Sequence, residues 1–200
     1  MGWSHGDEDI IPIDKAIDWF DITDVGRGAA RIDFDKLASI NSHYIRESGD
    51  ETLFELIKGP IEERIQSSLD QESITRLKNG IPALKSRAKT IPELIDNIVF
   101  YVQKRPLILN KKATNILNSD ARKRLAQLAK ILGDLGIWSE NSIEKVIKDF
   151  ANQQEINLKQ IALPFRAAIT GTTISPGIFE VAKILGQQET MGRLKDVAEI

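Results

Sequence analysis

Apolar residues recur at helical spacing from the middle of the chain to its end, whereas the strict alternation of a strand is nearly absent. The segment TIPELIDNIVFYV, residues 90–102, opens with Thr90 and carries Glu93 three residues later. This pair predicts a capping box, in which the hydroxyl and the carboxylate bind free N–H groups of the first turn. The apolar positions that follow lie on one helical face: Leu94, Ile95, Ile98, Val99 and Val102. The pattern predicts a helix with one buried stripe.

Two further helices are predicted between residues 119 and 150. The first, SDARKRLAQLAKILGDLG, is expected to stop at Gly136. It turns four leucines inward and its basic residues mostly outward: Leu125, Leu128, Leu132 and Leu135 against Arg122, Lys123, Arg124 and Lys130. In the second, WSENSIEKVIKDF, Ser139 is the expected N-cap and Trp138 is expected to pack on Ile143, with Val146, Ile147 and Phe150 continuing the stripe. Such stripes are typical of a core, so we expect these helices to form bundles.

The first fifty residues have a different character. They are dense in aspartate, glycine and turn-forming residues, as in HGDEDIIPID and VGRGAARIDFD, around two short expected helices near 14–20 and 34–46. Their glycines lack both the G-x-G-x-x-G spacing and the P-loop spacing with its lysine. We therefore interpret Gly6-Asp7, Gly26 and Gly28 as turns in a loop-rich, acidic segment.

The stretch LPFRAAITGTTISPGIFEV, residues 163–181, changes character twice and predicts helix, turn and helix. The first helix has Ile161, Phe165 and Ile169 on its apolar face, with Arg166 among them, and is expected to end at Gly171. Ser175 is the expected cap of the second helix, and Pro176 its first residue. The buried face of the second helix is expected to hold Phe179, Val181 or Ala182, and Leu185.

This turn is a candidate binding surface. The start of a helix presents unsatisfied N–H groups, here beside the hydroxyls of Thr172, Thr173 and Ser175. Such a surface suits a phosphate or the edge of a base. A helical hairpin without any ligand explains the same spacing equally well.

Composition narrows the classes of function. The 200 residues contain no cysteine, which excludes disulfides, thiolate catalysis and cysteine-ligated zinc. His5 and His43 are too few for a histidine-rich metal site, and neither lies in an arrangement with a nucleophile. There is no secretory leader and no apolar run near the ~20 residues of a membrane span. We expect a cytoplasmic protein that does not contact membranes.

The net charge of −2 hides an asymmetry between the halves of the chain. Residues 1–100 carry 12 basic against 19 acidic residues, and residues 101–200 carry 15 against 10. The strongest basic excess lies from Arg76 to Lys112, where nine basic residues face two acids, Glu93 and Asp96. This region predicts a polyanion as partner. For any single lysine in it, a solvated helical face is the simpler interpretation.

Several blocks of the sequence resemble one family. PFRAAITGTTISPGIFEVAKILG, residues 164–186, is similar to the C-terminal signature of bacterial glutamyl-tRNA synthetases, Leu/Phe-Arg-x-Ala-Leu/Ile-Thr-Gly followed by Ser/Thr-Pro-Gly-Leu/Ile-Phe-Glu. GWSHGD near the start, DFDKLASINSHYIR and LKSRAKTIPEL resemble further blocks of that family in the same order. The resemblance covers essentially the whole chain.

The resemblance implies an architecture. A partial, loop-rich stem-contact segment would occupy residues 1–58, and two helical bundle anticodon-binding domains would occupy residues 59–130 and 131–200. The family's catalytic domain carries His-x-Gly-His-like and Lys-Met/Leu-Ser-Lys-like motifs, and neither is found in this sequence. We therefore expect the C-terminal part of a longer enzyme, with Met1 an added or substituted start. It would have no catalytic residue, metal or cofactor of its own, and ATP and magnesium would bind the missing domain.

The resemblance also implies site residues. It places the anticodon-reading arginine of the first helical domain at Arg87, and contacts of the second at Arg166, Ser175 and Ile178. Glutamate anticodons end in C where glutamine anticodons end in G. Because arginine only donates hydrogen bonds, Arg87 can pair with O2 and N3 of an unstacked cytosine but meets N–H donors on guanine. Ser175 is expected to bond a base, and Ile178 to pack on its face.

Each arginine has an alternative interpretation. Arg87 would instead form a salt bridge or a carbonyl bond near a helix end, and Arg166 would be a buried structural arginine that braces the turn. Phosphate contacts that add affinity without sequence information are expected from the basic region: Lys85, Lys104, Arg105, Lys111 and Lys112.

The leading hypothesis from the sequence is tRNA anticodon recognition by a monomeric C-terminal part of a glutamyl-tRNA synthetase, with tRNA(Glu) as partner. The chain alone is expected to bind without catalysing. Two alternatives stay open. The parent enzyme would also charge tRNA(Gln), or the chain would be a helical scaffold that binds protein through apolar grooves, insensitively to salt.

Overall fold

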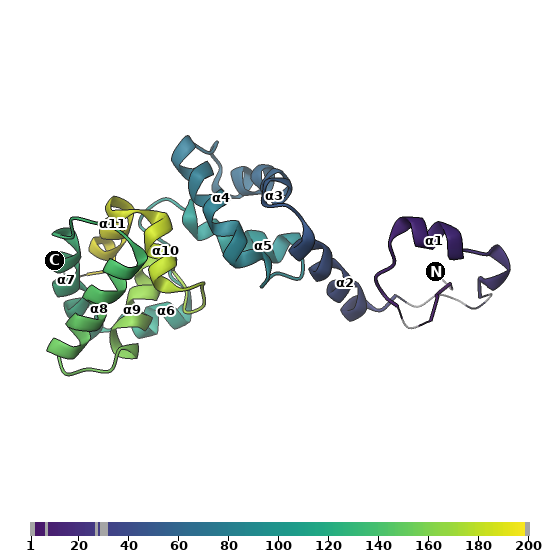
Figure 1. The fold of residues 1–200 in the computed structure, drawn as a ribbon. Coiled ribbons are helices and arrows are strands. Elements are labelled where there is room, and N and C mark those ends of the chain that lie inside the picture. The colour runs from purple at the N-terminus through teal and green to yellow at the C-terminus, as the bar shows by residue number, and fades with distance from the viewer. Residues whose placement is uncertain (1–2, 7, 27, 29–31, 199–200) are drawn as a thin grey trace.

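The computed structural model describes residues 3–6, 8–26, 28 and 32–198, and in those ranges the chain forms eleven α-helices, two 3-10 helices and no strand. The prediction of a mostly α, multi-helical fold is confirmed. Figure 1 shows an elongated arrangement, in which an N-terminal segment, a middle group of helices and a C-terminal group follow one another. The sequence predictions that involve Met1, Asp7, residues 27, 29–31 and 199–200 lie outside the described residues.

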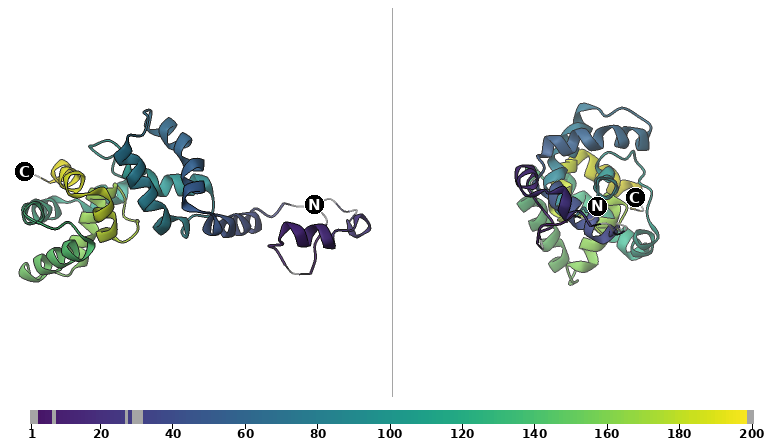
Figure 2. Two further views of the ribbon diagram at one scale, coloured as in Figure 1. Left: turned by 45° about the horizontal axis from the view of Figure 1, so that its top comes forward. Right: turned by 90° about the vertical axis from the view of Figure 1, so that its right-hand side faces the viewer.

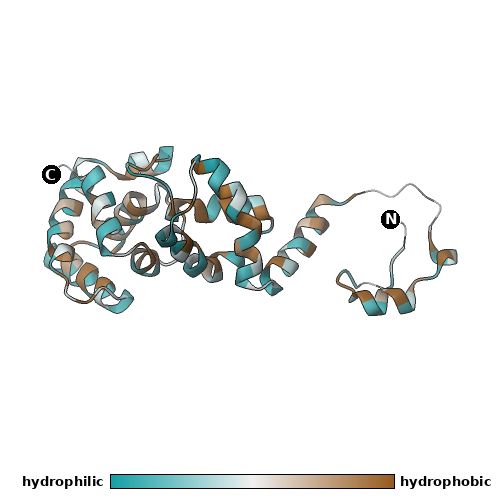
Figure 3. Ribbon diagram, turned by 90° about the horizontal axis from the view of Figure 1, so that it is seen from above, coloured by the Kyte–Doolittle hydropathy of each residue, from teal (hydrophilic) through white to brown (hydrophobic). Residues whose placement is uncertain are grey.

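The N-terminal segment contains α1 (Ile13–Trp19), the 3-10 helix η1 (Ile22–Asp24) and α2 (Phe34–Glu47), as expected near residues 14–20 and 34–46. The left view of Figure 2 shows α2 leading from this segment to the middle group. None of the residues of α1 is buried, and in α2 only Ile45 is. Apolar side chains such as Ile13 and Phe34 stay exposed, as the brown stretches of these helices in Figure 3 illustrate. The described part of this segment has no core of its own.

The middle group, called the first bundle below, consists of α3 (Asp50–Ile65), α4 (Gln71–Lys85), α5 (Ile91–Ile98) and the 3-10 helix η2 (Val99–Tyr101). Thr90 caps α5 as predicted, because its hydroxyl accepts the N–H of Glu93 at 3.2 Å. The Glu93 carboxylate accepts the N–H of Lys89 at 2.6 Å, one residue before the cap. The capping box therefore closes one residue further out than the usual geometry.

The C-terminal group, called the second bundle below, consists of α6 (Lys111–Ile116), α7 (Ser119–Gly133), α8 (Glu140–Gln153), α9 (Lys159–Thr170), α10 (Ile178–Leu185) and α11 (Gln187–Val197). Ser139 caps α8, with its hydroxyl accepting the N–H of Ser142. The predicted stripes are buried: Leu125, Leu128 and Leu132 on α7, and Ile143, Ile147 and Phe150 on α8.

The predicted end of α7 at Gly136 is wrong. The helix ends at Gly133, where Asp134 turns its N–H to the carbonyl of Leu132 and Leu135 bonds the same carbonyl. Gln187 of α11 also donates from Nε2 to the carbonyls of Leu132 and Gly133, so carbonyls at the end of the helix are bonded before Gly136 is reached. Leu135 consequently lies outside the helix and is only partly buried against the core.

The two domain boundaries expected from the sequence both fall inside helices. The boundary at 58/59 lies within α3, and the boundary at 130/131 lies within α7. Both α6 and α7 pack on α9, so they belong with the C-terminal helices. We propose instead a division at the connecting residues 102–110, which leaves every helix whole.

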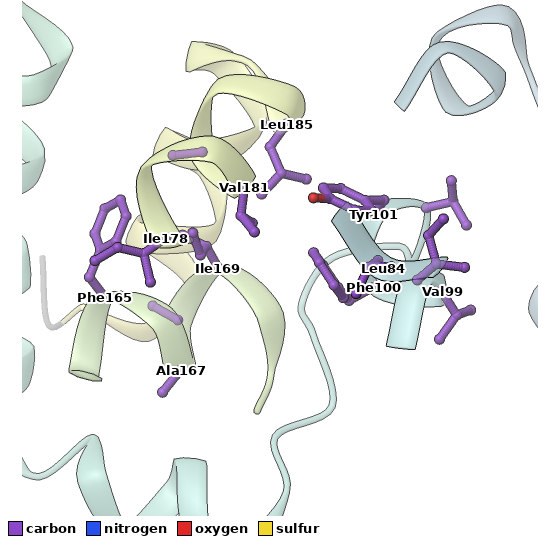
Figure 4. Packing of buried hydrophobic residues seen from close by; sticks show 14 of the residues in the cluster. Leu84, Val99, Phe100, Tyr101, Phe165, Ala167, Ile169, Ile178, Val181 and Leu185 are labelled. Carbon is purple, nitrogen blue, oxygen red and sulfur yellow. The ribbon is translucent and has the colours of Figure 1, made fainter. Parts of the chain in front are cut away.

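The cores of the two bundles are continuous. Buried apolar residues from Ile45 to Val197 form one cluster, and α4 of the first bundle contacts α10 of the second. Figure 4 shows where they meet: Leu84, Val99, Phe100 and Tyr101 face Val181 and Leu185 across the junction. Arg87 lies two residues after the end of α4, and the turn at residues 171–177 leads directly into α10. The packing of α4 against α10 therefore also holds these two parts of the candidate site.

Candidate nucleic-acid interface

The loop at residues 171–177 begins where α9 stops. Gly171 ends that helix as predicted, with a left-handed φ of 74°. Its carbonyl accepts the N–H of Asn110 at 3.0 Å, and a Cβ at this position would lie 2.8 Å from the carbonyl oxygen of Ile108. Only glycine fits both the backbone angle and the close approach. The 171–177 loop is thereby fastened to the segment that connects the two bundles.

The two threonines of the loop have different roles. The Thr172 hydroxyl accepts the N–H of Ile174 at 3.0 Å and donates to the carbonyl of the same residue at 2.6 Å. This hydroxyl shapes the turn in the RNA-free chain, and its contact with a base stays a prediction. Thr173 is half-buried, and no hydrogen bond of its side chain occurs among the described residues. It remains a candidate contact.

Three of the predicted site residues come together at Ser175. Arg166 of α9 donates from Nε to the Ser175 hydroxyl at 3.0 Å. Arg87, just after α4 in the first bundle, donates from Nη1 to the Ser175 carbonyl at 3.1 Å. The Ser175 hydroxyl in turn donates to the carbonyl of Pro176 at 2.9 Å. Residues that lie 79 positions apart in the chain, Arg87 and Arg166, thus meet on one loop.

Ser175 is not a helix cap, contrary to the sequence prediction. Helix α10 begins at Ile178, after Gly177, and no side chain caps it. The reason is tertiary: the Arg166 guanidinium takes the Ser175 oxygen that a cap would have offered to the helix. The carbonyl bond expected for Arg87 in its alternative interpretation is present. Arg166 is half-buried and braces the turn. Both alternative interpretations therefore describe contacts that exist in the RNA-free chain.

The two arginines make this surface electropositive. Burial lowers the pKa of the Arg166 guanidinium, and the positive charge of Arg87 lowers it further. Neither arginine forms an ion pair with a carboxylate in the part of the chain that the structure describes. An anion or an electronegative base edge beside them would relieve this repulsion. Arg87 is exposed, so it is the more accessible of the two.

The predicted apolar residue of the site is buried, and a neighbouring isoleucine is exposed. Ile178 is only 5% exposed and belongs to the core, so its side chain offers no face to a base. Ile174 is 79% exposed, one residue from Ser175, and the sequence analysis missed it. The signal was present, because Ile174 is the one large apolar residue inside the polar run Gly-Thr-Thr-Ile-Ser-Pro-Gly.

Two of the five predicted phosphate contacts are used inside the protein. Lys85 pairs with Asp50 at 2.8 Å and donates to the Ser48 carbonyl, which braces the start of α3. Arg105 lies 3.8 Å from Glu189 and 4.0 Å from Asp196 on α11. The remaining three, Lys104, Lys111 and Lys112, are exposed and form no ion pair among the described residues.

The described ranges show no sign of a metal site or a membrane span. No group of three histidine, aspartate or glutamate residues there is placed to hold a metal ion, and no helix there is both long and apolar enough to cross a membrane. His5 stacks on Trp19 with ring centroids 4.1 Å apart, and His43 meets Tyr44 edge to face. Both histidines lie in the N-terminal segment and outside the 171–177 loop.

Comparisons with known proteins identify relatives of this chain. The model of the anticodon binding domain family matches residues 52–198. Glutamate-tRNA ligase 2 of Zymomonas mobilis is 45% identical over 98% of this chain and 41% of its own length. Glutamate-tRNA ligase of Bradyrhizobium diazoefficiens is 42% identical over 100% of this chain and 43% of its own. The chain thus spans about two fifths of the curated relatives it matches.

A solved glutamate tRNA ligase from Elizabethkingia meningosepticum has the same fold, with a TM-score of 0.79, 21% identity and coverage of 98% of this chain and 38% of that chain. The resemblance to glutamyl-tRNA synthetases over essentially the whole length is confirmed. The family model alone covers both bundles. The chain belongs to the anticodon binding domain family.

Proposed function

We propose that this chain recognises the anticodon of tRNA(Glu) as the C-terminal part of a glutamate-tRNA ligase, a cytoplasmic enzyme that joins glutamate to its tRNA using ATP. One observation carries the proposal: Arg87 and Arg166, from different bundles, converge on Ser175, and no carboxylate of the described residues pairs with either. ATP and magnesium would bind outside these 200 residues. The chain contributes recognition.

Arg87 is the residue suited to choose between bases. Its Nη1 donates to the Ser175 carbonyl, which orients the guanidinium, while its other N–H groups form no hydrogen bond within the described ranges and lie at an exposed surface. A cytosine at the last anticodon position offers O2 and N3 as acceptors to these donors, and guanine presents N–H groups there. This arrangement supports the proposed preference for tRNA(Glu) over tRNA(Gln).

Contacts between lysine side chains and the RNA phosphates would supply affinity. Lys104, Lys111 and Lys112 lie exposed in and after the connecting segment 102–110, whose Asn110 is bonded to the 171–177 loop. Phosphates that flank an unstacked anticodon would reach these lysines without contributing sequence information.

Binding of the 200-residue chain to glutamate and glutamine tRNA transcripts over a salt series tests the proposed function. We expect tighter binding of the glutamate transcript and a linear fall of log K with log salt. Three lysine-phosphate contacts alone give a slope of roughly −2. Salt-insensitive behaviour or absence of RNA binding would contradict anticodon recognition. Equal affinity for both transcripts would indicate a parent enzyme that also charges tRNA(Gln).

Ile174 gives a second test at the loop itself. We expect Ile174→Ser to weaken glutamate tRNA binding about fivefold, since an exposed apolar side chain beside Ser175 can pack on a base, and base stacking is worth roughly 1–3 kcal/mol on larger aromatic platforms. Ile137→Ser is the matched control, because Ile137 is 75% exposed in the loop between α7 and α8. Equal loss in both variants would remove Ile174 from the interface.

A further inference from the structure

At the junction of the two bundles, the ring of Tyr101 packs against a glycine, Gly80. Tyr101 of η2 is fully buried, and its ring lies against Gly80 in the middle of α4. A Cβ at position 80 would be 2.5 Å from Cε2 and 2.9 Å from Cδ2 of this ring. Since a glycine inside a helix costs about 1 kcal/mol relative to alanine, its presence here is explained by the ring it admits.

The same ring reaches the second bundle. Figure 4 shows the Tyr101 hydroxyl directed toward Leu185 and Val181 of α10. This hydroxyl is buried and has no hydrogen-bond partner among the described residues. Burial, and next the nearby negative charge of Glu180 on α10, raise the pKa of the Tyr101 hydroxyl, while the positive charge of Arg193 opposes them. Tyr101 therefore occupies the space between α4 and α10.

The two helices on either side of the ring, α4 and α10, also adjoin the candidate site. Arg87 follows the end of α4, seven residues beyond Gly80, and Ser175 lies three residues before the start of α10. A second contact ties the same two helices, because Arg76 of α4 donates from Nη2 to the Leu185 carbonyl at the end of α10 at 3.0 Å. A change in the spacing of α4 and α10 at Tyr101 is therefore transmitted along both helices to the gap between Arg87 and Ser175.

We infer that Tyr101, seated on Gly80, is a positioning residue that sets the distance between Arg87 and the Arg166–Ser175 pair, and thereby the selectivity for the last anticodon base. The inference rests on the proposed function for its consequence in RNA binding. The inference assigns base selectivity to the buried contact of Tyr101 with Gly80, which is not part of the exposed surface at Arg87.

Gly80→Ala tests this directly, with Gly59→Ala as the matched control. Gly59 lies inside α3, and a Cβ there would meet nothing within 4 Å. Because the chain has no cysteine, spin labels can be placed at Lys89→Cys and Ile174→Cys, both exposed, on either side of the Arg87–Ser175 gap. We expect Gly80→Ala to shift or broaden the label distance in RNA-free protein and Gly59→Ala to leave it unchanged.

The consequence for RNA is measured on the unlabelled variants. We expect Gly80→Ala to reduce the preference for cytosine over guanine at the last anticodon base by roughly 2- to 30-fold, the range of coupling through a remote contact. The double variant Gly80→Ala/Tyr101→Leu, which frees the space of the ring, should recover part of the label distance and part of the preference. Circular dichroism confirms that each variant is folded.

Two outcomes would overturn the inference: an unchanged label distance in Gly80→Ala, or a changed distance with the wild-type preference kept. Failure of the proposed function looks different, because then the wild-type chain itself shows no tRNA binding or no base preference. In that case the label distance still decides whether Tyr101 sets the gap.

Discussion

Arg87→Gln is expected to remove most of the preference for a glutamate anticodon over a glutamine anticodon. A glutamine side chain both donates and accepts, so it pairs with the Watson-Crick edge of either base, whereas arginine only donates. A good bidentate contact discriminates by roughly 1–3 kcal/mol, so the affinity ratio should fall by about 5- to 150-fold. The measurement is the Kd of each variant for two transcripts that differ only at the last anticodon base.

The matched control for Arg87 is Arg64→Gln. Arg64 is an exposed arginine of the same bundle, paired with Asp96, so its replacement removes one positive charge from a side chain that makes no hydrogen bond to the 171–177 loop among the described residues. It should lower the affinity for both transcripts slightly and equally. If Arg87→Gln also weakens both transcripts equally, then Arg87 contributes charge without reading the base.

Local signals in the sequence predicted the helices well. Thr90 and Ser139 cap their helices in the structure because a hydroxyl at a helix start bonds a neighbour two or three residues away. The stripes of α7 and α8 are buried because their period is that of a helix. These outcomes depend on residues within one or two turns, which the sequence displays directly.

The partners that the sequence did not reveal come from tertiary contacts. Ser175 has the identity and position of a cap, but Arg166, nine residues earlier, takes its oxygen. Lys85 and Arg105 were assigned to phosphate from the local charge excess, yet their acidic partners come from other elements, Asp50 in one case and Glu189 with Asp196 in the other. Long-range partners of this kind leave no local pattern.

The candidate site was predictable only in part. The resemblance pointed to Arg87, Arg166 and Ser175, and the structure brings these three together. The resemblance also implied that Ile178 contacts a base, but the burial of Ile178 can be seen only once the packing of α10 is known. Ile174 is exposed in a turn that is longer than expected, since α10 starts at Ile178, two residues later than its expected first residue, Pro176.

Arg193→Leu is expected to cause the largest loss of stability of any single change considered. The Arg193 side chain is 0% exposed, donates from Nε to Glu189 at 2.7 Å and from Nη1 to the Ile169 carbonyl at 2.6 Å. Burial lowers the pKa of its guanidinium, and the Glu189 carboxylate opposes that effect. Its removal takes the guanidinium donor from the Glu189 carboxylate on α11 and from the Ile169 carbonyl near the end of α9. Breaking one side of a buried pair costs roughly 3–5 kcal/mol.

Lys148→Leu is the control that isolates burial as the cause. Lys148 pairs with Glu144 one helical turn away at 2.7 Å, the spacing and distance of the Arg193–Glu189 pair, but its side chain is 53% exposed. An exposed pair of this kind contributes about 0.3–0.5 kcal/mol. In urea unfolding, Arg193→Leu should therefore lower the free energy of unfolding several times more than Lys148→Leu. Similar losses would show that burial does not govern the Arg193 pair. Because Arg193 bonds Ile169 just before Gly171 and the 171–177 loop, we expect its loss to weaken tRNA binding as well.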